Sequence, residues 1–593
     1  MFLKQHRNNK TGRTHLTIVQ GFRENGKVKH KTVEVLGYLD ELEKKYDDPV
    51  AHFKEEIRRR NEEEKKAPST MQINLSAKLP TNCNERRNLG YAPLKSIYSE
   101  LGLHDFFQNK QRNIGAEFNL NSIFSMMVFS RMLFPSSIKK AYENRHVFFE
   151  PFNFSLDDAY RALDYFWKYS NEIQKLLADK TRELLGRNDE LGYYDVTNYY
   201  FEIPYEDEDE FDNDGNLVKP GQKKRGPSKE KRHDPIVQMG LLMDSNGIPL
   251  AFNMFPGNES EKVNMLPTIR RAKHEFGMER IVVVADRGLN TSDNSAFLSG
   301  VNDDDHKSGD GYVYGQSITG ADSEFKKWVL DPAGYQVDDE ITADGEIVKF
   351  KHKSRIYAKN VTLKNSNGKR NLSTQIYQKQ MVYYSDKYAR KQKFEREKLV
   401  AKAMDLIQSP SKYTRATSYG AAAYVNNLKF NKKTGEIATG SELSLDESKI
   451  KAEAAYDGYY AIVTSEMNLE DSQIRDIYRG LWEIEESFKV IKSEFKARPV
   501  FVKTDVHVNA HFLICFVCLV IMRVLEKMLG EKYTTKELRD AMIRYSCSYV
   551  DQGYYLFDFR NKITDAIGQK FDWDLTAKYM SKSDMKKILK YTK

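Results

Sequence analysis

The feature that most restricts the fold is the order of strand-like and helical segments between residues 192 and 318. Residues 192–202, 235–244 and 248–255 are rich in apolar and β-branched side chains, and Ser245-Asn246-Gly247 is a strong turn signal between the last two. A helical stretch then leads to a fourth strand, and a short helix leads to a fifth. The predicted order is therefore β-β-β-α-β-α-β.

Three meandering strands joined to two more through helical crossovers are typical of the ribonuclease H fold. We therefore expect an α/β protein with a ribonuclease H-like catalytic core. Residues 320–456 contain short strand-like pieces and one helical run (387–407), which indicates a β-rich insertion in that core. Two long helices, from about 469 to 496 and from about 506 to 529, follow the insertion.

The segment before the core predicts two further regions. Residues 15–38 alternate apolar and polar side chains around a turn at 24–27, which predicts a β-hairpin, and a charged helix should follow at about 48–66. The apolar spacing from Pro93 to about Asn188 is helical. The predicted divisions are 1–68 (hairpin and basic helix), 69–188 (helical), 189–319 (core, first part), 320–456 (insertion), 457–530 (core, second part) and 531–593 (C-terminal helical region).

Composition excludes several classes of protein. Of 593 residues, 40% are hydrophobic and 30% are charged, which fits a folded, soluble protein rather than a disordered chain. The longest apolar stretch, 512–522, is shorter than the roughly 20 residues of a membrane helix, and the N-terminus lacks an apolar signal core. We therefore expect no membrane partner. Four cysteines cannot supply a disulfide framework at this length, which is typical of a cytoplasmic protein.

Two aspartates occupy positions in the predicted sheet where an acid is costly without a partner. Asp195 lies in the middle of the first strand, and Asp286 ends the apolar run 281–285 at the carboxyl edge of the sheet. A single strand-end aspartate often caps the next turn. Two acids on adjacent strands favour a shared metal site instead.

Helical phase selects the third acid. Ile477, Ile484 and Ile491 belong to one apolar stripe of the helix 469–496, and Tyr478, Glu485 and Lys492 follow seven apart beside it. By the same phase, Glu486 should point farther towards solvent. The simpler alternative is that Glu485 forms an i,i+4 ion pair with Lys489.

Three carboxylates without a histidine or cysteine site suit Mg²⁺, which takes oxygen ligands and keeps waters and substrate phosphates in its remaining positions. Two such ions, with Mn²⁺ able to substitute, can activate a water or a 3′-hydroxyl and stabilise the leaving oxygen of a phosphoryl displacement. We therefore predict Asp195, Asp286 and Glu485 as metal ligands and catalytic residues.

With these residues in place, the sequence resembles the DDE transposases of bacterial insertion sequences, in the large group marked by Y-x2-R-x3-E-x6-K. Tyr478, Glu485 and Lys492 match that signature, and Trp482 and Ile484 also fit. Leu481 stands where the group has arginine, and Arg479 is the candidate replacement. Further likeness lies in YYDVTNYYFE, GPSKEKRHDPIVQMGLLMD, FPGNES and VVADRGLNTSDN, so that the resemblance covers about 190–500.

The resemblance implies an enzyme that binds the terminal inverted repeats of its element as a dimer or larger synaptic complex. It also implies Mg²⁺-dependent nicking and transfer of the freed 3′-OH into target DNA. Tyr478 and Lys492 would contact DNA phosphates near the cleaved end. Double-stranded DNA, both transposon end and target, is then the partner, and the protein is expected at the nucleoid. By the same resemblance, residues 1–68 are expected to bind the DNA end and the helical region 69–188 to bind DNA.

Basic residues elsewhere are candidates for the same DNA. The run after the acidic segment 206–210 contains Lys229 and Arg232, which lead back towards the strand beside Asp195. On the predicted N-terminal helix, Arg58, Arg59 and Arg60 are either a solvated face or part of end recognition. The predicted DNA-contacting residues are Tyr478, Arg479, Lys489, Lys492, Lys229, Arg232, Arg58, Arg59 and Arg60.

Two other functions stay open on the sequence. A ribonuclease H-like structure-specific nuclease would cut DNA without joining it, and the long insertion and the Tyr/Lys pattern count against this. A domesticated, non-mobile DNA-binding descendant would be expected to have lost an acid, whereas all three are present.

Overall fold

The computed structural model describes two compact units, Met1–Cys83 and Asn84–Lys593. It describes the chain apart from a few short stretches, namely 9–10, 25–26, 67–72, 74–75, 82, 85, 188–189, 228–232, 301–308, 342–346, 365–370, 416, 432–434, 439–441 and 591–593.

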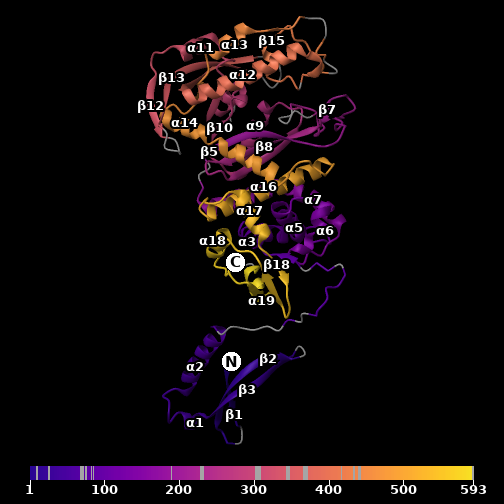
Figure 1. The fold of residues 1–593 in the computed structure, drawn as a ribbon, viewed down its shortest axis with the longest axis vertical. Coiled ribbons are helices and arrows are strands. Elements are labelled where there is room, and N and C mark those ends of the chain that lie inside the picture. The colour runs from indigo at the N-terminus through magenta and orange to yellow at the C-terminus, as the bar shows by residue number, and fades with distance from the viewer. Residues whose placement is uncertain are drawn as a thin grey trace. The chain divides into compact units, whose positions relative to one another are not determined.

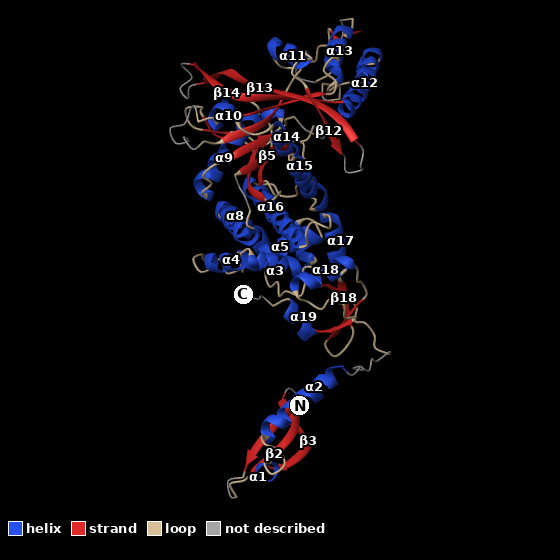
Figure 2. Cartoon of the chain, turned by 90° about the vertical axis from the view of Figure 1, so that its left-hand side faces the viewer, coloured by secondary structure: helices blue, strands red, loops and turns tan. Residues whose placement is uncertain are grey.

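The N-terminal unit is an antiparallel sheet of three strands with helices on one face (Figure 2). Leu16 of the central strand packs with Leu42 and Phe53 of the two helices to form its core. The predicted hairpin and charged helix are confirmed, although two residues of the turn lie outside the described residues. The first strand was not predicted. The elements are β1 (Phe2–Arg7), β2 (Thr14–Glu24), β3 (Lys27–Tyr38), α1 (Leu39–Leu42) and α2 (Pro49–Lys66).

A mixed sheet of nine strands forms the centre of the second unit, in the order β12-β13-β14-β17-β11-β10-β5-β8-β9. β5, β8 and β9 form an antiparallel meander, and β10 and β11 run parallel to β5. This order confirms the ribonuclease H-like topology predicted from the sequence. The strands are β5 (Leu191–Tyr200), β8 (Ile236–Asp244), β9 (Pro249–Pro256), β10 (Val282–Ala285) and β11 (Gly311–Gln316), with the crossover helices α9 (Glu261–Phe276) and α10 (Ser292–Leu298).

The insertion extends this sheet. β17 pairs antiparallel with β11 on one side and with β14 on the other, so the insertion strands continue the core sheet at its β11 edge. The predicted helical run is present as α12, which packs with α13 in a small apolar cluster of its own. The elements are α11 (Ser323–Leu330), β12 (Gln336–Ile341), β13 (Ile347–Lys364), β14 (Asn371–Ser385), α12 (Asp386–Gln408), β15 (Val425–Asn426), β16 (Ser444–Leu445), α13 (Glu447–Ala454) and β17 (Tyr459–Thr464).

The helices before the core do not form a separate unit. They pack around α16 (Asp505–Met528) (Figure 1). Helix α16 also contacts the sheet, where Phe512 packs on Tyr199 and Phe516 on Phe252. Local periodicity cannot reveal this joint core, because its partners are over 300 residues apart. The helices are α3 (Ala92–Glu100), α4 (Leu103–Gln111), α5 (Leu120–Leu133), α6 (Ile138–Glu143), α7 (Leu156–Lys168) and α8 (Ser170–Leu185).

Helix α16 confirms the helix predicted from about 506 to 529, and it contains the apolar stretch 512–522. In the described part of the chain it alone has the length and hydropathy to cross a membrane, and 89% of its apolar window is buried inside the protein. Its neighbours are apolar side chains from the helices and the sheet. It is therefore packed as the central helix of a core.

The C-terminal region contains strands as well as helices, which corrects the prediction of a helical region over 531–593. Its three strands pair with one from residues 86–88, in the order β20-β19-β18-β4. These strands are short and find their partner far away in the sequence, so no local pattern announces them. The elements are β4 (Arg86–Asn88), α17 (Thr535–Arg544), β18 (Ser546–Tyr549), β19 (Tyr554–Phe557), α18 (Lys562–Phe571), β20 (Tyr579–Ser581) and α19 (Lys582–Ile588).

The helix predicted over 469–496 is broken into three parts. α14 (Asp471–Arg479) ends at Gly480, α15 (Trp482–Lys489) follows, and residues Val490–Glu494 form a π-helical turn. A side chain at Gly480 would have its Cβ 2.2 Å from the hydroxyl of Tyr193 on β5. The glycine thus allows the helix to approach the sheet closely at the break.

Candidate active site

Asp195 and Asp286 lie on neighbouring parallel strands. Val282, Val283 and Val284 of β10 pair with Leu191, Gly192 and Tyr193 of β5. Asp195 and Asp286 each follow the last of these pairs, Tyr193 with Val284, by two residues. Side chains two residues apart in extended chain point to the same face of a sheet. Both aspartates therefore belong to the face of Tyr193 and Val284, and a metal site shared between them stays a prediction.

The face that carries these aspartates is the one on which α14 packs. Tyr193 and Val284 each lie two residues before an aspartate and so share its face of the sheet. Both form an apolar cluster with Ile474 of α14. The opposite phase of the strands, including Tyr194 and Val283, packs in a different cluster with α9 and α10. The helix predicted to carry the third acid thus starts on the correct face.

Tyr478 at the end of α14 reaches Asp286. Its hydroxyl donates to Asp286 Oδ1 at 3.5 Å, a long hydrogen bond. Burial, and after it the negative charge of Asp286, raise the pKa of Tyr478 above its ordinary value. Gly315 at the end of β11 makes room, because a Cβ there would lie 2.4 Å from the Tyr478 hydroxyl. The tyrosine therefore remains a neutral donor beside the aspartate.

Lys492 reaches the strand of Asp195. Its Nζ donates to Thr197 Oγ1 at 2.7 Å and lies 5.3 Å from the ring centroid of Tyr199. Thr197 is two residues after Asp195, so both side chains are on the same face of β5. The sequence prediction did not include Thr197, although period-two spacing from Asp195 could have indicated it.

Glu485 lies between these two contacts along the helix, seven residues from each. Tyr478 on one side contacts Asp286, and Lys492 on the other contacts the neighbour of Asp195. The segment that carries Glu485 therefore runs along the face of the two aspartates. This is the geometric basis for keeping Glu485 as the predicted third acid.

The predicted exposure of the two adjacent glutamates is wrong. Glu485 is exposed, whereas Glu486 is partly buried and accepts from Lys489 at 3.1 Å. The predicted alternative, an ion pair between Glu485 and Lys489, is thus replaced by a pair with Glu486. The break at Gly480 and the π-helical turn change the phase that a single straight helix would have. An exposed Glu485 remains accessible to solvent and substrate.

The carboxylate of Glu483 on α15 lies against the turn between β8 and β9. Gly247 in that turn has φ +74°, and a Cβ there would lie 2.1 Å from Glu483 Oε2. Burial raises the pKa of Glu483, and the positive charges of Lys527 and Arg523 oppose this shift. This partly buried carboxylate therefore lies two residues before Glu485, where α15 approaches the turn.

The start of α14 is held by the insertion. Asp471 accepts from Lys379 Nζ at 2.8 Å and lies 3.1 Å from His352 Nδ1, and both partners belong to insertion strands. Burial pushes the pKa of Asp471 up, but the hydrogen bonds from Lys379 and His352 outweigh it, so the pKa lies below its ordinary value. The insertion therefore anchors the helix that carries Tyr478.

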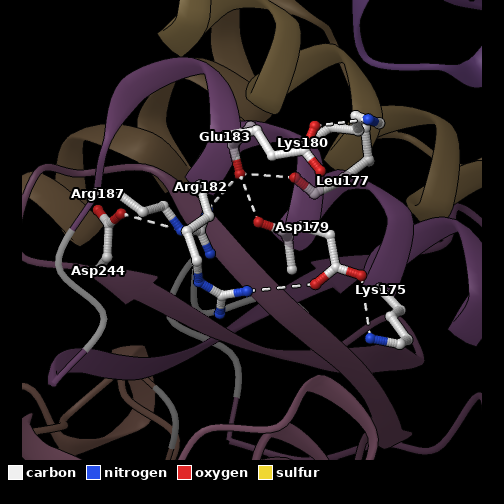
Figure 3. Close-up of polar contacts among 10 residues, drawn as sticks. Lys175, Leu177, Asp179, Lys180, Arg182, Glu183, Arg187 and Asp244 are labelled. Atoms are coloured by element: carbon white, nitrogen blue, oxygen red, sulfur yellow. Dashed lines mark hydrogen bonds and ion pairs between the residues drawn. The ribbon is translucent and has the colours of Figure 1, made fainter.

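A buried ion pair joins the loop after α8 to the end of β8 (Figure 3). Arg187 Nε lies 3.6 Å from Asp244 Oδ2, and both side chains are fully buried. Arg187 also donates to Thr181 Oγ1 at 2.5 Å, and Asp244 accepts from the backbone N–H of Ile248 at 2.8 Å. Burial raises the pKa of Asp244, and the charge of Arg187 opposes this. The pair ties the helical region to the strand beside β5.

A cavity of about 1100 Å³ opens beside Asp286. Tyr478 and Arg479 line one part of it, and α12 of the insertion lines another. Sequence reasoning missed the basic residues of α12, although Lys387 and Lys391 have the i,i+4 spacing of one helix face. The positively charged residues around the cavity are Arg287, Lys387, Lys391, Arg396 and Arg479.

The donor set suits a hard divalent cation, because carboxylate oxygens are the ligands that Mg²⁺ prefers. Asp195 and Asp286 each lie two residues beyond the last paired residues of β5 and β10, and the helix of Glu485 lies on their face. Among the residues that the structure describes, no three His, Cys, Asp or Glu side chains are close enough together to form a ready metal site. The three carboxylates thus suit a divalent cation in ligand type, and all three belong to segments on one face of the sheet.

The remaining predicted DNA contacts divide into three groups. Arg479 is half exposed beside the cavity, and Lys489 is exposed on α15. Lys229 and Arg232 lie outside the described residues. On α2, Arg58 pairs with Glu55 at 2.5 Å, and Arg60 pairs with both Glu34 and Glu56 at 2.6 Å, while Arg59 is exposed. Acids of the same unit therefore pair with Arg58 and Arg60.

Comparison with known protein families gives two matches. Residues 3–70 match the N-terminal domain of the IS1634 family transposases, and residues 328–521 match the transposase DDE domain. The first match spans the three-stranded unit, and the second runs from the insertion through the helix of Glu485 into α16. No curated protein matches the chain.

Proposed function

Because this chain belongs to the DDE transposases of bacterial insertion sequences, enzymes that act on DNA, we propose that it cuts the ends of its own element and joins them to target DNA. The observation that supports this best is that Tyr478 contacts Asp286 and Lys492 contacts Thr197, two residues after Asp195, so that the helix of Glu485 runs along both aspartate strands. We propose these three carboxylates as the catalytic residues.

DDE transposase domains generally use divalent metal ions. In our proposal Asp195, Asp286 and Glu485 would hold two Mg²⁺ ions, with Mn²⁺ able to substitute. When bound, such ions activate the attacking oxygen and stabilise the leaving oxygen.

The reaction consists of two phosphoryl displacements. In the first, water attacks the phosphorus at the end of the element, the bond from phosphorus to the 3′ oxygen breaks, and that oxygen leaves with a proton as a 3′-hydroxyl. In the second, this hydroxyl attacks a phosphorus of the target, and the target's own 3′ oxygen leaves as a hydroxyl. The number of phosphodiester bonds is conserved in the second step, so no energy source is required.

Residues flanking Glu485 would hold the DNA. Tyr478 is a neutral donor beside Asp286, and Lys492 places a positive charge beside Thr197. A phosphate near the scissile bond can accept from both. Arg479, Lys489, Lys229 and Arg232 would extend the contact along the backbone, and Arg479 would take the place of the family arginine.

The protein would act at the nucleoid on double-stranded DNA, with both ends of the element held in a dimer or larger synaptic complex. Two ends must be joined to one target site, so two active sites must be brought together. This requirement supports an assembly of at least two chains on DNA.

The test is incubation of the full chain with labelled DNA bearing the element's own ends, in Mg²⁺, with cleavage and joining scored separately. We expect nicked ends and joined products. Cleavage without joining would favour a structure-specific nuclease, and binding without cleavage would favour a domesticated descendant. Either result would overturn the proposal.

A further inference from the structure

The helix of Glu485 ends in a backbone conformation that depends on support from other elements. After the π-helical turn Val490–Glu494, Lys496 has φ +45°, in the left-handed region that residues other than glycine seldom adopt. Such a conformation persists only where the surrounding structure determines it. The last carbonyl groups of a helix also lack hydrogen-bond partners within the helix. The contacts made to this helix end are therefore informative.

Two buried side chains supply those contacts. Arg131, in the last turn of α5, donates from Nη1 to the carbonyl oxygens of Phe495 and Lys496, each at 3.3 Å. His511 of α16 donates from Nε2 to the carbonyl oxygen of Ala497 at 3.1 Å. Side chains of α5 and α16 thus hold three successive carbonyl groups.

The arginine also determines the tautomer of the histidine. Arg131 Nη2 lies 3.5 Å from His511 Nδ1, and a guanidinium group only donates hydrogen bonds. Burial, and after it the positive charge of Arg131, lower the pKa of His511 to about 3, so the imidazole ring is neutral at physiological pH. Nδ1 of the neutral ring therefore accepts from Arg131, and the proton lies on Nε2, which faces Ala497.

A second arginine holds the end of α5. Arg539 of α17 donates from Nε to the carbonyl oxygen of Met132 at 2.9 Å and from Nη2 to that of Leu133 at 3.2 Å. Its Nη1 lies 3.4 Å from Glu494 Oε2 in the π-helical turn. A positive charge at the C-terminal end of a helix is favourable, because the carbonyl ends of the peptide dipoles gather there. Arg539 thus joins α17 both to α5, beside Arg131, and to the turn.

Lys492 is the residue whose position depends on these contacts. It lies in the π-helical turn, and its Nζ donates to Thr197 Oγ1 at 2.7 Å. The hydrogen bonds of a π-helix span five residues where those of an α-helix span four. A return to α-helical geometry would therefore rotate the side chain of Lys492 about the helix axis, away from Thr197. Contacts that hold the end of the turn also set the direction of this lysine.

We propose that Arg131 and Arg539 are positioning residues, which direct Lys492 towards the aspartate strand β5. The inference rests on the proposed function, in which this lysine holds a phosphate of the DNA end. Both arginines lie outside the two regions that match transposase domains, 3–70 and 328–521. The site thus depends on α5 and α17, which belong to the helical region before the core and to the C-terminal region.

The first experiment measures the position of Lys492 without DNA. The full chain is treated with a limiting amount of an amine-reactive reagent, and mass spectrometry compares labelling of Lys492 with that of Lys489, which is 70% exposed. We expect Lys492 to be labelled about fivefold faster in Arg131→Met and in Arg539→Met than in the parent, because its hydrogen bond to Thr197 is then lost.

Arg271→Met is the matched control. Arg271 of α9 likewise donates to a main-chain carbonyl, that of Phe252 at 2.6 Å, but α9 packs on the other face of the sheet. Labelling of Lys492 in this variant should equal that of the parent. Circular dichroism and urea unfolding check that all variants fold under the conditions of the assay.

The second experiment asks whether Arg131 acts on DNA through Lys492. Binding of a labelled duplex carrying the terminal repeat is measured by fluorescence anisotropy at several salt concentrations. We expect Arg131→Met to lower the slope of log K against log salt by about one unit, as is expected for Lys492→Ala, and the double variant to bind within about twofold of Lys492→Ala. Arg271→Met should keep the slope of the parent. A purely structural role for Arg131 would weaken binding without a change of slope.

The inference is overturned if labelling of Lys492 is unchanged in both arginine variants, if it rises equally in Arg271→Met, or if the effects of Arg131→Met and Lys492→Ala on binding add. Should Arg131→Met fail to fold, Arg539→Met decides the same points. Failure of the proposed function is distinguishable, because labelling requires no DNA. A parent chain that neither binds nor cuts the terminal repeat overturns the proposed function, and labelling still decides whether the arginines position Lys492.

Discussion

The hydroxyl of Tyr478 lies 3.5 Å from Asp286 Oδ1, although 192 residues separate them in the chain. The contact joins the end of α14 to the end of β10. It matters because the next acidic residue along the same helical line is Glu485, and because the strand next to β10 carries Asp195. Several predictions about the site depend on this arrangement.

Replacing Tyr478 with Phe removes the hydroxyl and keeps the packed ring. We expect the cleavage rate to fall by up to about tenfold, since one modest hydrogen bond corresponds to about 1 kcal/mol. The raised pKa of Tyr478 means that its hydroxyl stays protonated up to and beyond pH 10. The pH–rate profile between pH 6 and 9 should therefore keep its shape in Tyr478→Phe. Loss of an alkaline limb in this variant would contradict the assignment of a neutral donor.

Lys492 and Lys489 form a matched pair for testing the DNA contact. Lys492 is partly buried against Thr197, whereas Lys489 is 70% exposed and pairs with Glu486. Lys492→Ala should weaken end binding and lower the slope of log K against log salt by about one unit. Lys489→Ala should change both much less. Equal salt slopes for Lys492→Ala and the parent, with full joining activity, would assign Lys492 a purely structural role.

Gly247→Ala tests whether Glu483 orients the helix of Glu485. An alanine Cβ at residue 247 would lie 2.1 Å from Glu483 Oε2, and the backbone φ of Gly247 is +74°. Gly277 has a similar φ of +69° with nothing within 4 Å of its Cβ, so Gly277→Ala carries only the backbone strain of about 1–2 kcal/mol. We expect Gly247→Ala to reduce cleavage about tenfold or more, because small displacements of a catalytic group are costly. Urea unfolding measures the strain in both variants. Equal cleavage rates in the two variants would show that Glu483 does not position α15.

The buried pair Arg187–Asp244 should dominate the stability of the joint between α8 and β8. Arg187→Met leaves a buried carboxylate without its main positive partner, and we expect a loss of about 3–5 kcal/mol in the free energy of unfolding at pH 7. Arg161→Met breaks a pair in which the arginine is 60% exposed and should cost at most about 1 kcal/mol.

The same pair predicts a pH dependence. Burial raises the pKa of Asp244 in the folded state above its value in the unfolded chain, so protonation favours the folded state. The loss of unfolding free energy in Arg187→Met, relative to the parent, should therefore shrink as the pH falls through the folded-state pKa of Asp244 and its carboxyl group becomes neutral. Unfolding measured between pH 4 and 7 checks this. A deficit that grows on acidification would contradict the account.

The part of the fold that follows from local pattern could be predicted from the sequence. Each of the five core strands has an alternating or continuous apolar pattern within its own segment. Their order therefore indicated the ribonuclease H-like topology, which places Asp195 and Asp286 on adjacent strands. The C-terminal strands could not be predicted, because β18 finds its partner at residues 86–88. The continuation of the sheet through β17 likewise depends on pairing between distant segments.

The candidate site shows the limit of helical phase. The spacing of Tyr478 and Lys492 indicated one side of the helix, and both residues contact the aspartate strands, whereas the placement of Glu485 between them stays a prediction. The relative exposure of Glu485 and Glu486 was wrong because it assumed a straight helix. Gly480 breaks the helix where it approaches Tyr193, and that contact is visible only in three dimensions.

The central claim is that Asp195, Asp286 and Glu485 share a divalent cation, and Mn²⁺ binding tests it most directly. Electron paramagnetic resonance would measure the Mn²⁺ bound by the complex of the full chain with its terminal-repeat DNA. Asp195→Ala, Asp286→Ala and Glu485→Ala should each lower bound Mn²⁺ and abolish cleavage while end binding persists, and Glu486→Ala should retain both Mn²⁺ and cleavage. Unchanged Mn²⁺ binding in the three variants, or loss of Mn²⁺ in Glu486→Ala with Glu485→Ala intact, would contradict the claim.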